Sequence, residues 1–204
     1  MKKILFTLCL FLGMAVSMTA AESATALLDR AANHYRVAKS ITAGYTMSAD
    51  GSATAGSITV SGTRFYISSP DMTVWYDGKT QWSYSPAINE VNITEPTAEE
   101  LQQVNPFAII QAFRRAYKAG YVGKANGVTR QVQLTALNPR DEIRKAIVTM
   151  NTSTLFPASI VLTMTGNKTI TIKVSSARVG ATLPMSTFRF EKKKAPKAQV
   201  VDLR

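Results

Sequence analysis

Very few side chains in this sequence have the chemistry that catalysis needs. The chain of 204 residues contains one His and one Cys. His34 lies in a segment with helical spacing, and no second imidazole or thiol accompanies it to form a nucleophile pair or a metal site. Cys9 lies in an N-terminal segment that we expect to be removed, so the mature chain would have neither thiol chemistry nor disulfides.

Two pairs of adjacent carboxylates are the remaining candidates for acid–base chemistry. Glu99 and Glu100 stand at the start of a predicted helix, and Asp141 and Glu142 stand beside a turn. Adjacent side chains point to different sides of a chain, so neither pair resembles the facing carboxylates of a glycosidase. No glycine-rich phosphate loop is found either. We therefore expect a protein that is not an enzyme and that uses no cofactor and no metal.

The most informative segment is a hairpin rich in aromatic residues. Asp77-Gly78 predicts its tight turn, because glycine accepts the positive φ that such a turn needs. A two-residue loop would place Trp82 opposite Trp75, whereas a three-residue loop would place Trp82 and Tyr84 on the face of Val74. We expect the three-residue loop, because it gives one continuous apolar face.

Residues 1–21 resemble a secretory signal peptide. Two lysines are followed by an apolar stretch over residues 4–16 and by small residues up to Ala21, near which we expect cleavage. Residues 22–204 then form a single domain, and the formal charge falls from +11 to +9. A basic surface could suit nucleic acid, but export from the cell argues against that partner.

The remaining chain alternates between helical and strand-like patterns. A first helix is predicted around residues 26–38, capped by Ser23 or Thr25, and a short one begins at residues 97–100. A second long helix is predicted over residues 106–118, opened by Asn105-Pro106 and ended by Gly120. Period-two runs predict strands from residue 41 to residue 94, and again over residues 128–137, 143–150, 158–165, 169–175, 187–190 and 199–203.

This order of elements predicts an α+β fold built on a large antiparallel sheet, with two or three helices. Such a sheet either packs on a second sheet or curls into a barrel, and the pattern leaves both choices open. The helix over residues 106–118 carries Phe107, Ile110 and Phe113 on one face, and this face would close one opening of a curled sheet. A hydrophobic pocket behind this lid would result.

The sequence resembles the LolA-type periplasmic outer-membrane lipoprotein carrier family, and is most similar to its divergent branch in Bacteroides-type bacteria. The resemblance rests on WYDGKTQWSYSP at residues 75–86, which follows GSITV at 56–60 and RFYI at 64–67. It continues through EV at 90–91, NPF at 105–107, STFRF at 186–190 and VVDLR at 200–204. It therefore extends over nearly the whole chain after residue 21.

The resemblance implies an incompletely closed β-barrel whose helices cover a hydrophobic cavity. It also implies a periplasmic carrier that receives lipoprotein acyl chains from an inner-membrane lipoprotein-releasing ABC transporter and moves them to an outer-membrane acceptor. We expect a monomer whose partners are acylated lipoproteins. The expected lid face is Phe107, Ile110 and Phe113. The residues expected to line the cavity are Met47, Ile58, Val60, Phe65, Ile67, Val74, Trp82 and Tyr84.

One departure from the family pattern concerns an arginine. Better-known carriers have an Arg-Pro pair shortly before the strand that matches Phe65, and that arginine helps to control the lid and the hand-over. Here the matching stretch is SGTR at residues 61–64, without proline. Arg64 is either a substitute in hand-over control or a surface arginine of a strand.

Three other functions are compatible with the same sequence features. A shuttle for a free lipid or glycolipid needs the same cavity with a different ligand. An envelope lipid-sensing domain would have an attached membrane anchor or second domain, which we do not expect in this chain. An enzyme with a carboxylate site would need an ionised pair inside a polar cavity.

Overall fold

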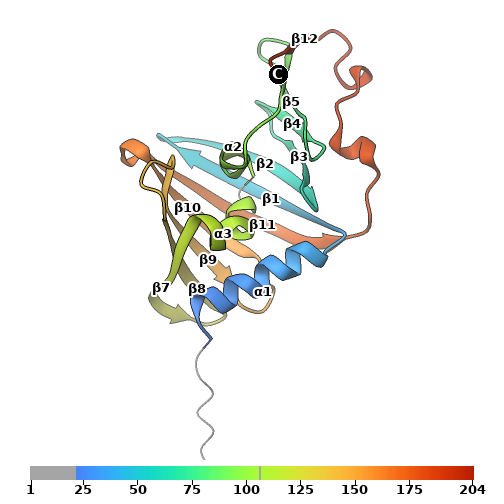
Figure 1. The fold of residues 1–204 in the computed structure, drawn as a ribbon. Coiled ribbons are helices and arrows are strands. Elements are labelled where there is room, and N and C mark those ends of the chain that lie inside the picture. Colours follow the sequence, from blue (N-terminus) through green and yellow to red (C-terminus); the bar gives the residue numbers. More distant parts are fainter. Residues whose placement is uncertain (1–21, 106) are drawn as a thin grey trace, which may run out of the picture.

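The computed structural model describes residues 22–105 and 107–204, which form a curved sheet with helices on its concave side (Figure 1). The expected signal peptide and the expected helix start at Pro106 lie outside these residues. The helices are α1 (Ala24–Val37), α2 (Ala98–Val104) and α3 (Ala108–Ala116), with the 3₁₀-helices η1 (Thr165–Asn167), η2 (Met185–Phe188) and η3 (Lys192–Lys194). Within these ranges no helix has both the length and the apolar character that crossing a bilayer requires.

Twelve strands of the described residues form a single sheet. They are β1 (Ser40–Ala49), β2 (Ser52–Ser61), β3 (Arg64–Ser68), β4 (Thr73–Tyr76), β5 (Gln81–Ser85), β6 (Glu90–Thr94), β7 (Tyr117–Asn126), β8 (Thr129–Ala136), β9 (Ile143–Asn151), β10 (Pro157–Met164), β11 (Thr169–Gly180) and β12 (Gln199–Asp202). Their spatial order is β12-β6-β5-β4-β3-β2-β1-β11-β10-β9-β8-β7.

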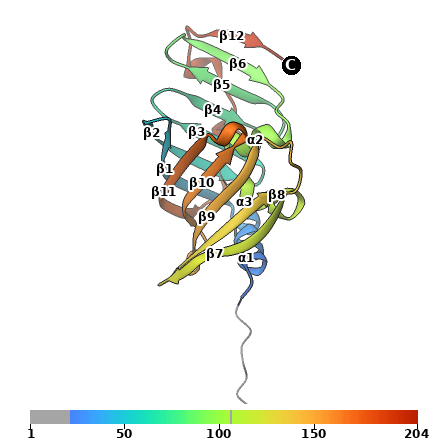
Figure 2. The ribbon, with the colours of Figure 1, turned by 90° about the vertical axis from the view of Figure 1, so that its left-hand side faces the viewer.

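This sheet is antiparallel throughout, except that β12 runs parallel to β6. β12 and β7 stand at its two edges, so the curled sheet does not close into a complete barrel (Figure 2). The expected α+β class with an open, curled sheet and covering helices is confirmed. The expected edge strand at the C-terminal end is also confirmed, as β12.

Local features of β1 and β2 allow the sheet to curve. The pairing of β1 with β11 shifts between Thr42 and Gly44, and such a bulge bends a strand and increases its twist. Gly56 of β2 faces Tyr45 of β1, and a Cβ at Gly56 would lie 2.6 Å from the backbone oxygen of Ser68. Glycine is therefore required at this position, because any larger residue would clash with the backbone.

Helix α1 begins as expected. The Ser23 hydroxyl accepts a hydrogen bond of 3.1 Å from the backbone N–H of Ala26, which satisfies an otherwise unpaired donor of the first turn. Leu27, Leu28, Ala31 and Tyr35 follow at helical spacing and are buried. This stripe packs against the concave face of the sheet.

Helix α3 ends earlier than expected. The helix stops at Ala116, and residues 117–126 form the edge strand β7, in which Tyr117 pairs with Ala136 and Gly120 with Gln133. The prediction that Gly120 ends the helix was wrong. Tyr117 continues the apolar helical spacing of Phe113, so the local pattern predicts a longer helix. In the structure the backbone of Tyr117 instead adopts a strand conformation, and pairing with β8 satisfies its hydrogen-bonding groups.

The expected register of the aromatic hairpin was also wrong. The backbone N–H of Asp77 donates to the carbonyl of Thr80 at 3.2 Å, and the Asp77 carboxylate accepts from the backbone N–H groups of Lys79 and Thr80. These bonds close a two-residue loop. Trp82 consequently pairs with Trp75, and Ser83 with Val74.

The C-terminal part of the chain explains why the aromatic residues take this register. After β11 the chain returns along the convex face of β3 and β4 before it reaches β12 (Figure 1). Residues 187–190, expected as a strand, instead include the end of η2, where Phe188 is fully buried. This segment covers the convex face, so apolar side chains on that face are also buried.

Candidate functional site

The concave face of the sheet and the inner faces of α1 and α3 enclose one continuous apolar interior. Five of the expected cavity residues lie on this face, each at most 4 % exposed: Ile58, Val60, Phe65, Ile67 and Val74. The strand register confirms that they share a face, because Ile58 pairs with Ile67 and Val60 with Phe65.

Three other expected lining residues are placed differently. Met47 shares the concave face by its pairing with Ile172, but it lies near the end of β1 and is 41 % exposed. Trp82 and Tyr84 lie on the convex face, because the hairpin register places them opposite Trp75 and Thr73. Their assignment to the cavity is therefore corrected, and the turn that closes the hairpin is the cause.

The second half of the sheet contributes as much to this interior as the first, and no residue from it was included among the expected lining residues. Its buried members include Val132, Leu134, Val148, Met150, Ile160 and Ile172. They occupy alternate positions in strands that the period-two pattern predicted. Extending that alternation across the predicted sheet would have identified them.

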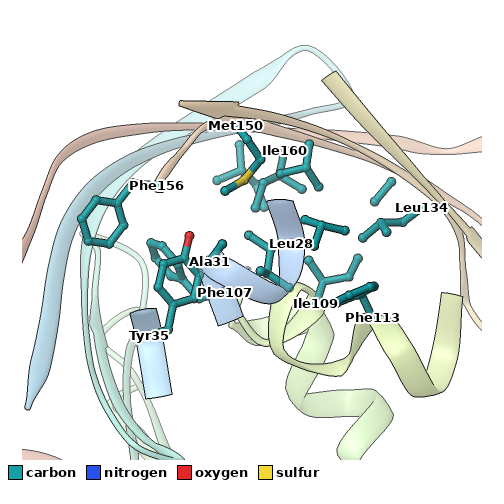
Figure 3. Packing of buried hydrophobic residues seen from close by; sticks show 14 of the residues in the cluster. Leu28, Ala31, Tyr35, Phe107, Ile109, Phe113, Leu134, Met150, Phe156 and Ile160 are labelled. Atoms are coloured by element: carbon teal, nitrogen blue, oxygen red, sulfur yellow. The ribbon is translucent and has the colours of Figure 1, made fainter. Parts of the chain in front are cut away.

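Side chains of the helical layer fill the concave space (Figure 3). The expected lid residues Phe107, Ile110 and Phe113 are 2 %, 0 % and 3 % exposed. The Phe107 ring meets that of Tyr35 edge to face at 5.7 Å, so the start of α3 packs against α1. The structure therefore has these three side chains turned inward, against the apolar interior.

Tyr35 anchors α1 within this interior. Its ring stacks on Phe156 with centroids 5.7 Å apart, and its hydroxyl donates a 2.6 Å hydrogen bond to the carbonyl of Leu155. Burial raises the pKa of Tyr35, so the hydroxyl stays neutral and keeps this bond. His34 lies beside it, with its ring 5.5 Å from that of Phe156.

An exposed ion pair joins α1 to α3. Arg114 donates two hydrogen bonds to the Asp29 carboxylate, one of them from Nε at 2.6 Å. The hydrogen bond from Arg114 lowers the pKa of Asp29 below its ordinary value. In the part of the chain that the structure describes, no other ion pair links these two helices.

Arg64 lies on the other side of the sheet. Its guanidinium donates to the backbone carbonyl and the hydroxyl of Ser61, contacts Met185 Sδ at 3.6 Å and lies 5.2 Å from the ring centroid of Phe188. These contacts hold the C-terminal segment against the convex face. A role for Arg64 in lid control has no support from them, because α3 lies on the concave side.

Two hollows flank α3 at the surface. A pocket of about 420 Å³ lies between α1, α3 and the turn between β2 and β3, and Asp29 is among its lining residues. A second pocket, of about 510 Å³, lies between α2, α3 and the start of β7, with Leu101, Ala112 and Ile143 in its lining. Gln111 of α3 lines both pockets. The outer surface of α3 is therefore open to solvent on both of its sides.

No metal site is found in this region. The described residues contain no group of three or more His, Cys, Asp or Glu side chains that could hold a metal ion. The interior is lined mainly by apolar side chains, and the hydroxyl of Tyr35 is a polar group within it.

Comparisons with known proteins agree with this geometry. The family described as "Outer membrane lipoprotein carrier protein LolA" matches residues 14–167. An uncharacterized conserved protein from Thermus thermophilus is 13 % identical, with a TM-score of 0.58 over 86 % of this chain and 96 % of that chain. A DUF1329 family protein from Desulfovibrio piger is 11 % identical, with a TM-score of 0.50 over 84 % and 98 %. No curated protein matches the chain.

A third similar structure is a LolA superfamily protein from Nitrosomonas europaea, 11 % identical, with a TM-score of 0.44 over 82 % of this chain and 98 % of that chain. At these identities the first two structures show that the fold recurs in other bacterial proteins.

Proposed function

The chain belongs to the family of LolA outer membrane lipoprotein carrier proteins, and on that premise we propose that it carries acylated lipoproteins across the periplasm. The acyl chains would lie between the concave face of the sheet and the helices. An inner-membrane lipoprotein-releasing ABC transporter would supply the cargo, and an outer-membrane acceptor would receive it from the monomeric carrier.

The observation that supports this proposal most strongly is the continuous apolar interior closed by a short helix. The buried residues Ile109, Ile110 and Phe113 of α3 occupy space against the sheet that acyl chains would need. Each buried CH₂ group contributes roughly 0.8 kcal/mol of favourable free energy, whether it belongs to an acyl chain or to a side chain of α3. The cargo and the helix therefore compete for the same apolar surface with similar free energies of burial. An exchange of this kind gives reversible binding, which a carrier needs.

The polar contacts of α3 are compatible with such an exchange. The helix has nine residues, and its ion pair with α1 is exposed to water, where such pairs contribute little to stability. Because pockets lie on both flanks of α3, the helix has few side-chain contacts there that would have to break when it moves away from the sheet. In this proposal α3 is the moving part, and the sheet with α1 is the fixed part.

Native mass spectrometry of the protein purified from its own periplasm tests the proposal. We expect bound species with the masses of acylated polypeptides. A free phospholipid or glycolipid in their place would contradict lipoprotein transport and support a lipid shuttle. Loss of outer-membrane sorting of lipoproteins after depletion of the protein is the matching expectation in the cell.

A pair of neighbouring substitutions in α3 makes the test specific. Ile110→Glu places a charge on the buried face of α3 and weakens the packing of this helix against the sheet, so we expect it to raise the fraction of protein that carries cargo. Gln111→Glu changes the exposed neighbour and is expected to leave that fraction unchanged. Circular dichroism of both variants checks that the sheet is retained. Equal cargo occupancy in the two folded variants would contradict the assignment of α3 as the lid.

A further inference from the structure

A further pocket, with a different chemistry from those beside α3, lies on the convex face of the sheet. Tyr66, Trp75 and Tyr84 come from the neighbouring strands β3, β4 and β5, and the ring centroids of Tyr66 and Trp75 are 5.8 Å apart. Thr73, which pairs with Tyr84, completes this wall. Tyr66 pairs with Trp75 and Tyr84 pairs with Thr73, so the two tyrosines stand on either side of β4 with a stagger of two residues. The Trp75 ring lies beside that of Tyr66 and completes the aromatic wall.

The C-terminal segment forms the opposite wall. Thr187 of η2 and Lys194 of η3 face the aromatic strands across a pocket of about 470 Å³, a volume typical of small-molecule sites. Lys194 Nζ lies 5.5 Å from the ring centroid of Trp75 and donates to the carbonyls of Ser186 and Arg189 at 2.7 and 2.6 Å. These bonds leave one of its three N–H donors available.

Several hydroxyl groups in this pocket have no hydrogen-bond partner among the residues that the structure describes. In residues 22–105 and 107–204, the hydroxyls of Tyr66, Thr73 and Thr187 take part in no hydrogen bond, whereas that of Tyr84 donates to Asn89 at 3.3 Å. A purely apolar ligand would leave such groups unpaired, which is costly in a covered site. The pocket therefore suits a ligand that has both apolar faces and hydroxyl groups.

The charge around the pocket favours an acidic ligand. Lys192, Lys193, Lys194 and Lys197 lie close together in the C-terminal segment. Glu191 is the acidic residue within this run, and it pairs with Lys193 at 2.6 Å. The cluster keeps a positive excess, and such a field attracts anionic groups to a neighbouring cleft.

We propose that this convex-face pocket binds an acidic sugar, a pyranose ring that carries a carboxylate or a phosphate. The C–H face of the ring lies against the aromatic side chains, and its hydroxyls bond to Tyr66, Thr73 and Thr187. The acidic group lies toward Lys194. This site is separated from the apolar interior by the sheet, and it does not depend on the function proposed for that interior.

The tryptophans of the chain provide a direct measurement. The sequence has two, Trp75 and Trp82, which pair with each other on this face. We expect a saturable change in tryptophan emission on titration with a hyaluronan tetrasaccharide, which carries glucuronate carboxylates. Neutral chitotetraose is expected to bind roughly tenfold more weakly because it lacks them. Sodium acetate, which has the charge without a ring, is expected to cause no saturable change.

Three variants localise the binding. Tyr66→Ala is expected to weaken hyaluronan tetrasaccharide binding roughly tenfold, and Lys194→Met to remove the preference over chitotetraose. Tyr121→Ala on β7, at the other edge of the sheet, is the matched control and is expected to bind normally. Circular dichroism melting confirms that each variant is folded. The proposal is overturned if neither tetrasaccharide gives a saturable change or if folded Tyr66→Ala binds as well as wild type.

Discussion

At the scale of single residues, Asp29 and Arg114 form the polar connection between the fixed and the moving parts of the proposed carrier. The Arg114 side chain is 63 % exposed and that of Asp29 is 38 % exposed, so water and salt screen their attraction. Such a contact orients α3 in the closed arrangement without holding it irreversibly. Arg64, for which the sequence left open a role in hand-over control or a place as a surface arginine of a strand, packs on the C-terminal segment.

Asp29→Asn tests this connection. Removing the charge weakens the closed arrangement, and we expect acyl-chain uptake to become roughly twofold to fivefold faster at low salt, the range typical of exposed ion pairs. The difference from wild type is expected to shrink as salt rises. Stopped-flow fluorescence with a labelled acyl chain measures the rate. Asp50→Asn, which removes a comparable exposed pair with Lys168 that involves neither α1 nor α3, is the control.

The pH dependence of the same pair follows from the lowered pKa of Asp29. A carboxyl whose pKa is depressed by folding contributes stability that is full above its ordinary value of 3.8 and is lost as the pH falls through the folded value. Wild type and Asp29→Asn should therefore differ by a constant amount at pH values well above 3.8 and converge as the pH falls through the lowered pKa of Asp29. A difference that grows on acidification would contradict the role given to Asp29.

At the scale of elements, α3 differs from the other parts of the core in how it is attached. It shares the apolar cluster with the sheet, but its outer surface is flanked by two pockets and its last residue leads directly into the edge strand β7. In the proposed carrier, α3 opens while the sheet stays folded. Local opening limits how much a substitution in α3 can reduce global stability.

Phe113→Ala and Phe65→Ala provide a matched comparison, because both phenylalanines are buried, at 3 % and 1 % exposure. For Phe65→Ala, in the sheet, we expect a loss of about 3–5 kcal/mol in the free energy of unfolding. For Phe113→Ala we expect a smaller loss, together with rapid hydrogen exchange confined to α3. Urea unfolding and amide exchange measure both quantities. Equal losses would indicate that α3 is an ordinary part of the core.

The same elements show what the sequence could predict. Period-two alternation identified the strands from β8 to β11, and the capping residues located the starts of α1 and α2. The end of α3 was not predicted correctly because Tyr117 continues the apolar spacing of the helix. The helix ends there because the backbone of Tyr117 pairs with β8, which is a contact between separate segments of the chain. The face of Trp82 was missed because its apolar cover comes from the C-terminal segment, about a hundred residues later in the chain. No local pattern contains that information.

At the scale of the whole molecule, the sheet separates two apolar surfaces. The concave one is large, free of tryptophan and filled by helices, whereas the convex one is aromatic and covered by the C-terminal segment. The sequence had placed Trp82 and Tyr84 in the first, and the structure places them in the second. The two surfaces can therefore be studied separately in one protein.

Acyl chains brominated along their length test this separation, because bromine quenches tryptophan emission on contact. We expect brominated acyl chains to bind with little quenching, since Trp75 and Trp82 lie beyond the sheet from the interior. Introducing tryptophan on the concave side, with Met47→Trp, should make emission sensitive to the same ligand. Strong quenching of the unmodified protein would place the acyl chains on the convex face and contradict the proposed site.

The central claim is that acyl chains take the place of α3 against the sheet, and a distance between α1 and α3 tests it most directly. Asn33 and Gln111 are exposed residues that line the same pocket between these helices, and residues 22–204 contain no cysteine that would interfere with labelling. Spin labels at Asn33→Cys and Gln111→Cys report the separation by double electron–electron resonance. We predict that a triacylated lipopeptide shifts the distance distribution to longer values, while the same peptide without acyl chains leaves it unchanged. An unchanged distribution with the lipopeptide demonstrably bound would contradict the account.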